Sequence, residues 1–265
     1  MEFLDLAFAV KLAATAAVVL LATLIAERAG AFIGAMIAAL PISAGPAFLF
    51  LAMEHGPAFL AKSALMALAL NAAVAPFLLV AALVVRRHGI LAAIAAAFPV
   101  WLGAAALFLY LDIGLAAALL ANVLAYGVCL PLSAPLRAGG AAIRRRRGLF
   151  DIALRVAAVV AVIAAALTAG RLLGPTVAGV AAVIPVIWLS MSVVVYARSG
   201  GGACSAILAN GIPGMIGFVL ALTALTVLPP LHGSGLALGS ALALCVGWNL
   251  GLTVLRAARG RRRLA

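Results

Sequence analysis

Two apolar segments interrupted by proline contain the residues best suited to bind a solute. The central prolines are Pro41, in the run LPISAGP, and Pro185. The candidate side chains that follow them are Ser43, Pro46, Trp188 and Ser190. A proline inside a helix removes a backbone donor and clashes with the carbonyl four residues earlier, and in lipid a freed carbonyl needs an internal partner or a wet cavity. We therefore expect both breaks to border one site near the middle of a membrane, the alternative being two kinks that serve packing alone.

Two asparagines extend this predicted site. Asn210 lies in an apolar segment that also contains Pro213, and Asn71 lies near the middle of another. An amide inside such a segment should not face lipid. Asn210 is expected either to hydrogen-bond an exposed carbonyl of a broken helix or to contact the solute, and Asn71 is a weaker candidate of the same kind. Asn122 and Asn249 are predicted to form interhelical hydrogen bonds.

Glycines in the same segments predict where helices approach closely. Gly211, Gly214 and Gly217 recur every three residues and form one smooth helix face. Small-residue motifs also occur near the end of the chain, at Gly235-x-x-x-Gly239 and Gly247-x-x-x-Gly251. Packing inside the molecule is the expected role of both motifs.

The residues that enzymes, proton relays and metal sites require are missing from the apolar segments. Glu27, Glu54 and Asp112 lie at segment ends, whereas a proton relay needs an ionisable group inside the membrane. The three histidines lie in loops, and the three cysteines are far apart and form no metal-ligand spacing. We therefore expect no catalytic residues, no bound metal and no cofactor, and we expect that the protein is not an enzyme.

The elements that must position these residues are membrane helices. With 68% hydrophobic and 9% charged residues and a mean hydropathy of +1.32, the chain does not fit a soluble globular domain. Apolar stretches of about 20 residues, enough to cross a ~30 Å hydrocarbon core, follow one another along it. The sequence predicts nine transmembrane helices, at residues 5–26, 30–53, 58–85, 89–111, 113–133, 151–170, 174–197, 203–228 and 234–255.

An internal repeat organises these nine segments. Residues 11–111 recur without a gap at residues 155–255, at a constant offset of 144 that superimposes Pro41 on Pro185. The same offset superimposes the pair His88-Gly89 on His232-Gly233, which suggests a structural role at a turn, a shared gating role being the alternative. Four segments fall in each copy and a fifth lies between them, so the second copy should cross the membrane upside down. Inverted repeats are typical of secondary transporters.

The predicted fold class is therefore an all-α integral membrane protein with nine transmembrane helices. Two inverted-topology four-helix repeats, residues 1–112 and 151–265, are joined by a connecting helix and a basic loop in residues 113–150. The second and seventh helices are the ones broken by proline.

The basic residues predict the orientation of the chain. Fifteen of the 18 lie in the loops after segments 1, 3, 5 and 7, at the ends bordering them or at the C-terminus, and such loops face the cytoplasm. The N-terminus is then outside and the C-terminus inside. The run Arg144 to Arg147 is expected to anchor this topology, and contact with anionic lipids is the alternative. No nucleic-acid partner is expected, and the Ala-, Leu- and Arg-rich composition suggests a bacterial inner membrane.

These features favour a small secondary transporter or permease for a neutral, amphipathic or small anionic solute. A small anion would be held by half-helix N-termini, which carry partial positive charge and free N–H groups. The alternative is a scaffold or assembly subunit of a larger complex that transports nothing. A channel would need a continuous polar stripe, which the few Ser, Thr and Asn residues do not form.

Overall fold

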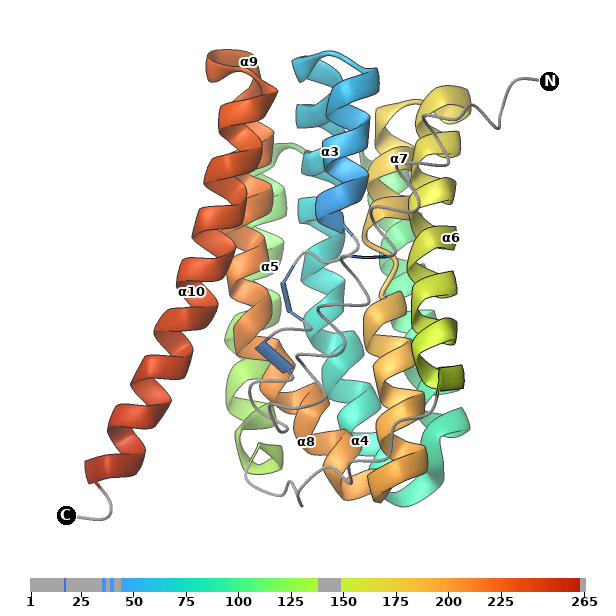
Figure 1. Cartoon of the computed structure of the whole chain (residues 1–265), viewed down its shortest axis with the longest axis vertical. Coiled ribbons are helices and arrows are strands. Elements are labelled where there is room, and N and C mark those ends of the chain that lie inside the picture. The colour runs from blue at the N-terminus through green and yellow to red at the C-terminus, as the bar shows by residue number, and fades with distance from the viewer. Residues whose placement is uncertain (1–16, 18–34, 37–38, 41–43, 138–148, 263–265) are drawn as a thin grey trace.

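The computed structural model describes residues 17, 35–36, 39–40, 44–137 and 149–262, and the regular structure of this part of the chain is helical (Figure 1). Almost all of the first predicted segment, 5–26, lies outside it. The helices are α3 Ala44–Glu54, α4 Pro57–Leu111, α5 Leu115–Ser133, η1 Ala134–Leu136, α6 Leu149–Leu173, α7 Pro175–Ala182, α8 Val186–Val227, α9 Pro229–His232 and α10 Ser234–Arg262.

Four stretches of the described chain are helical, long and apolar enough to cross a membrane. They are Pro57–Leu111, Leu115–Leu136, Pro175–Val227 and Ser234–Ala258. Helices of this length and composition mark an integral membrane protein. The first and third have 55 and 53 residues, more than twice the ~20 residues that one crossing needs.

Both of these long stretches fold back on themselves. Phe77 and Ala97 of α4 would lie about 30 Å apart along a straight helix, yet both line one small cavity. In α8, the Cys204 thiol donates a 3.4 Å hydrogen bond to the carbonyl of Ser192, although a straight helix would separate the two by about 18 Å. Each stretch is therefore a helical hairpin, as Figure 1 shows for α4.

Glycines with positive φ make the two hairpin turns. Gly89 has φ 80° and ψ −179°, and Gly200 has φ 76° and ψ −179°. This conformation is essentially restricted to glycine. The turns lie against each other, because a Cβ atom on Gly89 would meet the Tyr196 hydroxyl at 3.1 Å and one on Gly201 would meet the Val85 carbonyl at 2.5 Å. Both turns lie within a few residues of the predicted segment ends.

The repeat-related pairs His88-Gly89 and His232-Gly233 each lie at the end of a helical segment. Gly233 follows α9 with φ 80°, the same value as Gly89, so the two repeat-related glycines share a turn conformation. The repeat-related pair Gly56 and Gly200 differs, since Gly56 has φ −72° and Gly200 has φ 76°. The role predicted for the His-Gly pairs, at a turn, is confirmed at the backbone of Gly89 and Gly233.

The first half of α4 and the second half of α8 form the centre of the bundle, and α5 and α10 lie at its periphery. Large side chains such as Phe77, Leu78, Ile207 and Leu208 are fully buried at the centre. The outer helices expose Leu120, Val123, Leu124, Leu250, Val254 and Leu255, as expected for surfaces that meet lipid. Figure 1 shows α10 leaning away from the bundle toward its C-terminal end.

One prediction about glycine packing is confirmed and another is wrong. A Cβ on Gly214 would meet Ala39 at 2.8 Å and one on Gly217 would meet the Cys245 carbonyl at 3.1 Å, so this face of α8 is closely packed. By contrast, a Cβ on Gly235, Gly239, Gly247 or Gly251 would meet nothing within 4 Å. These α10 motifs do not pack inside the molecule, because the helix turns another face, with buried Ala237, Ala241 and Cys245, toward α8.

Candidate functional site

The helix break at Pro185 is the structural feature from which the candidate site is built. Helix α7 ends at Ala182 and α8 begins at Val186, and the residues between them are not helical. Pro185 has φ −76° and ψ 44°, and the N–H of Val186 donates to the carbonyl of Ile184 at 2.7 Å. This pattern is a tight three-residue turn. The predicted interruption of the helix by Pro185 is confirmed.

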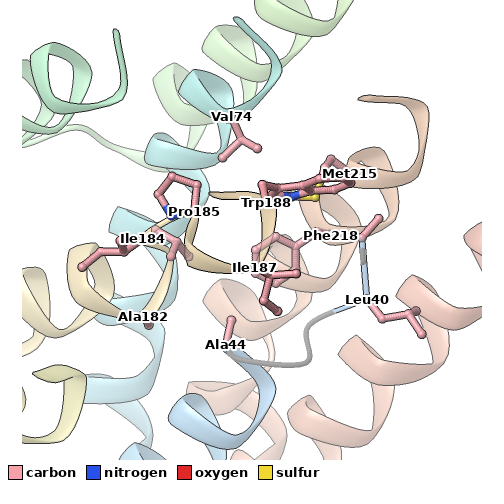
Figure 2. Close-up of a pocket in the computed structure, with 12 residues that line it drawn as sticks. Leu40, Ala44, Val74, Ala182, Ile184, Pro185, Ile187, Trp188, Met215 and Phe218 are labelled. Atoms are coloured by element: carbon pink, nitrogen blue, oxygen red, sulfur yellow. The ribbon is translucent and has the colours of Figure 1, made fainter. Parts of the chain in front are cut away.

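A cavity of about 40 Å³ opens at this break. Its walls come from four parts of the chain, namely the residues flanking 41–43, the first half of α4, the break itself and the second half of α8. The lining residues are Ala39, Leu40, Ala44, Val74, Ala182, Val183, Ile184, Pro185, Ile187, Trp188, Met215 and Phe218. Figure 2 shows Pro185, Ile187 and Trp188 grouped with Val74, Met215 and Phe218.

The lining of this cavity is apolar in its side chains, whereas the sequence predicted a partly polar one. Polar groups are available from the backbone, because the first N–H groups of a helix have no partner within it. In α8 these N–H groups include those of Ile187 and Trp188, and both residues line the cavity. Since 10–15 Å³ holds one water, the cavity has room for a few waters and is far smaller than a typical ligand pocket.

Trp188 is fixed at the cavity wall by its neighbours. Its side chain is 4% exposed, and its carbonyl accepts a 2.6 Å hydrogen bond from the Ser192 hydroxyl. A Cβ on Gly211 would overlap Cη2 of the indole, so the ring lies directly on the α8 backbone. The sequence placed Trp188 at the site, but it contained no signal for Val74, Met215 or Phe218.

The remaining proline and serine candidates take other places. Pro41 and Ser43 lie outside the described residues, although their neighbours Leu40 and Ala44 line the cavity. Pro46 lies in α3, half-buried and away from the lining. The Ser190 hydroxyl donates to the carbonyl of Ile187 at 3.1 Å. The carbonyl of Pro213 accepts from Trp248 Nε1 at 2.8 Å, which joins α10 to α8.

Asn71 belongs to a buried cluster between α4 and α5. Its amide nitrogen donates to Asn122 Oδ1 at 3.1 Å and to the Tyr126 hydroxyl at 3.0 Å. Asn122 in turn donates to the carbonyl of Leu68 at 2.8 Å. The predicted interhelical role of Asn122 is confirmed, as is that of Asn249, which donates to the carbonyl of Gly214 at 3.4 Å. Asn71 Oδ1 is buried without a hydrogen-bond partner.

Asn210 lies apart from the cavity, next to the C-terminal end of α5. Its amide nitrogen donates to the carbonyls of Ala206 and Arg137, at 2.7 and 3.2 Å. Its amide oxygen accepts a 3.0 Å hydrogen bond from Arg256 Nη1. The carbonyls that Asn210 binds are therefore those of its own helix and of the residue after η1, and neither belongs to the break at Pro185.

An ion pair joins α3 to α6. Arg171 Nε and Nη2 each donate to a carboxylate oxygen of Glu54 at 2.9 Å. At the neighbouring residue Gly170, a Cβ would lie 2.9 Å from the Leu51 side chain, so α3 and α6 are also closely packed there. This bidentate pair connects two helices that the repeat assigns to different halves of the molecule.

The described part of the chain contains no group of three or more His, Cys, Asp or Glu side chains that could hold a metal ion. No protein-family model matches the chain, and no curated protein or solved structure is detectably similar to it.

Proposed function

We propose that the protein is a small secondary transporter whose solute binds at the helix break. The supporting observation is that one cavity is bordered both by the break at Pro185 and by Leu40 and Ala44, the neighbours of the repeat-related Pro41. Two broken helices that meet near the middle of a membrane are the arrangement in which transporters bind solutes.

The proposed architecture has nine membrane crossings in two inverted repeats, with the N-terminus outside. The fold-backs at Gly89 and Gly200 support it, because they divide α4 and α8 close to the predicted segment ends. The small cavity corresponds to a closed form, so the two repeats would have to move apart to admit a solute from either side. Such alternation around a fixed site is the usual mechanism in proteins of this type.

The apolar lining favours a neutral or amphipathic solute. Val74, Ile187, Trp188, Met215 and Phe218 supply aliphatic, sulfur and aromatic surface and no charge. The unpartnered N–H groups in the first turn of α8 could bind one oxygen atom of such a solute or a small anion. The proposed solute therefore has a compact apolar body and one acceptor group.

A thermal-shift screen of the purified protein in detergent tests this proposal. Amphipathic metabolites and small organic anions are titrated against the natural chain, Trp188→Phe and Trp101→Phe, because Trp101 is equally buried but does not line the cavity. A solute that raises the melting temperature should lose most of that effect in Trp188→Phe only, and proteoliposomes should then accumulate it. Stabilisation that survives Trp188→Phe unchanged would place the solute elsewhere.

A scaffold function is the second candidate, and the size of the cavity is what favours it. A space of about 40 Å³ is what packing defects also leave. A scaffold would purify together with a stoichiometric membrane partner and would respond to no solute in the screen. Accumulation of any solute in proteoliposomes containing only this chain would exclude the scaffold.

A further inference from the structure

Three separate elements meet around Asn210, at the end of the bundle where α5 stops. Asn210 on α8 binds the backbone carbonyl of Arg137, the residue that follows η1. It also accepts a hydrogen bond from the guanidinium of Arg256 on α10. The 3% exposed Asn210 therefore connects the backbone of Arg137 with the guanidinium of Arg256, 119 residues further along the chain.

The guanidinium of Arg137 has hydrogen-bond partners for some of its donors and not for others. Its Nη2 donates to the Leu130 carbonyl and to the Ser133 hydroxyl, both at 2.7 Å. Its Nε is buried and has no hydrogen-bond partner. Burial lowers the pKa of this guanidinium below its usual value. Both of its partners are neutral, so no carboxylate among the described residues balances the charge of Arg137.

A partly buried guanidinium with one orphan donor needs an anion. Leaving a buried charge uncompensated destabilises a protein strongly, and a paired anion removes that cost. Guanidinium groups bind phosphate oxygens in the geometry that their N–H donors present. A second cation, Arg256, binds the amide oxygen of Asn210, whose amide nitrogen binds the backbone carbonyl of Arg137.

We propose that Arg137, Asn210 and Arg256 form a binding site for the phosphate of an anionic phospholipid. The lipid as the source is supported by the surface beside the site, where Leu132, Val254 and Leu255 are more than half exposed. An acyl chain would lie along these side chains while the phosphate meets the guanidinium groups. Basic pockets between membrane helices on the cytoplasmic side bind anionic headgroups in this way.

The test measures the melting temperature of the full-length, delipidated protein in detergent. The probes are phosphatidylglycerol, phosphatidylcholine and inorganic phosphate, each titrated against the natural chain and against Arg137→Gln, Arg256→Gln and Arg137→Lys. The matched control is the double variant Arg86→Gln/Arg87→Gln, which removes two exposed arginines from the turn at Gly89.

Phosphatidylglycerol should raise the melting temperature, and phosphatidylcholine should have little effect. Each glutamine variant should weaken the apparent affinity about fivefold, and Arg137→Lys should also weaken it because an ammonium lacks the planar set of donors that a guanidinium presents to a phosphate. The control variant should match the natural chain. A full response to inorganic phosphate, with no added effect of the lipid, would overturn the lipid as the source. Equal responses of the natural chain and the two glutamine variants would overturn the site itself.

Failure of the lipid-site proposal can be distinguished from failure of the proposed solute site. Loss of the lipid response leaves the cavity at Pro185 intact, because neither arginine lines it. If the glutamine variants fold poorly, Arg137→Lys keeps the charge and the hydrophobic stem and still removes the planar guanidinium. An unchanged lipid affinity in a well-folded Arg137→Lys would contradict the role assigned to the guanidinium of Arg137.

Discussion

At the scale of single residues, the contact between Gly211 and Trp188 holds the indole that forms part of the cavity wall. The indole ring lies so close to the α8 backbone that a methyl group at position 211 would overlap it. The ring is 4% exposed and lines the cavity. A side chain at residue 211 would therefore displace either the indole or the α8 backbone.

Gly211→Ala should destabilise the protein by about 1–3 kcal/mol, the usual cost of overpacking. Gly247→Ala is the matched control, because its Cβ would meet nothing within 4 Å, and it should be neutral or slightly stabilising. Denaturant unfolding in detergent measures both effects. An unaltered stability of Gly211→Ala would mean that the indole moves aside without strain.

The buried cluster of Asn71, Asn122 and Tyr126 gives a second prediction at this scale. Tyr126→Phe removes the hydroxyl that accepts from Asn71 at 3.0 Å, so the free energy of unfolding should fall by about 0.5–1.5 kcal/mol. Tyr110→Phe, at an 87% exposed position, should change it very little. The comparison is made by thermal unfolding in one detergent, and equal effects of the two substitutions would show that the cluster contributes no net stability.

At the scale of elements, the turns at Gly89 and Gly200 determine how the long helices are arranged. Gly200→Ala should cost about 1–3 kcal/mol because its φ of 76° strains any other residue, although a Cβ there would meet no atom within 4 Å. Gly202→Ala, two residues later and without a positive φ, should cost nothing. Melting temperatures distinguish them, and similar values for the two variants would show that the turn relaxes freely.

The sequence predicted the turns and the break better than it predicted the lining of the cavity. Proline restricts the backbone locally and glycine permits turns with positive φ, so Pro185, Gly89 and Gly200 could be recognised without knowledge of distant contacts. Val74, Met215 and Phe218 could not be recognised, because apolar residues surround each helix and give no period that marks the inner face. The contacts of Asn210 with Arg137 and Arg256 could not be recognised either, because these residues lie 73 and 46 positions away in the chain.

At the scale of the whole molecule, the distribution of arginine predicts orientation. Reporter fusions at Ala265 should behave as cytoplasmic and fusions after Asp112 as external, because 15 of the 18 basic residues fall on the side assigned to the cytoplasm. A cytoplasmic signal after Asp112 would contradict both the number of crossings and the inversion of the second repeat. A fusion after Ser133, expected to be cytoplasmic, controls for the reporter.

The ion pair between Glu54 and Arg171 has a consequence for the symmetry of charge in the molecule. The offset of 144 carries Glu54 onto Arg198 and Arg171 onto Glu27, so acid and base exchange places between the repeats. Glu27 lies outside the described residues, and the expectation rests on the register alone. If the repeats are related by a two-fold axis, Glu27 and Arg198 should be energetically coupled at the opposite face.

A charge-exchange cycle measures that coupling. Arg198→Glu should lower the melting temperature, and adding Glu27→Arg should restore part of it, with a coupling of about 0.2–1 kcal/mol. The same cycle at Glu54 and Arg171, whose contact is bidentate, provides the positive control. In a protein built in this way, two symmetry-related ion pairs would hold the outer and inner faces closed. Breaking one pair would favour the form that is open to one side of the membrane, and breaking its repeat-related counterpart would favour the form that is open to the other side.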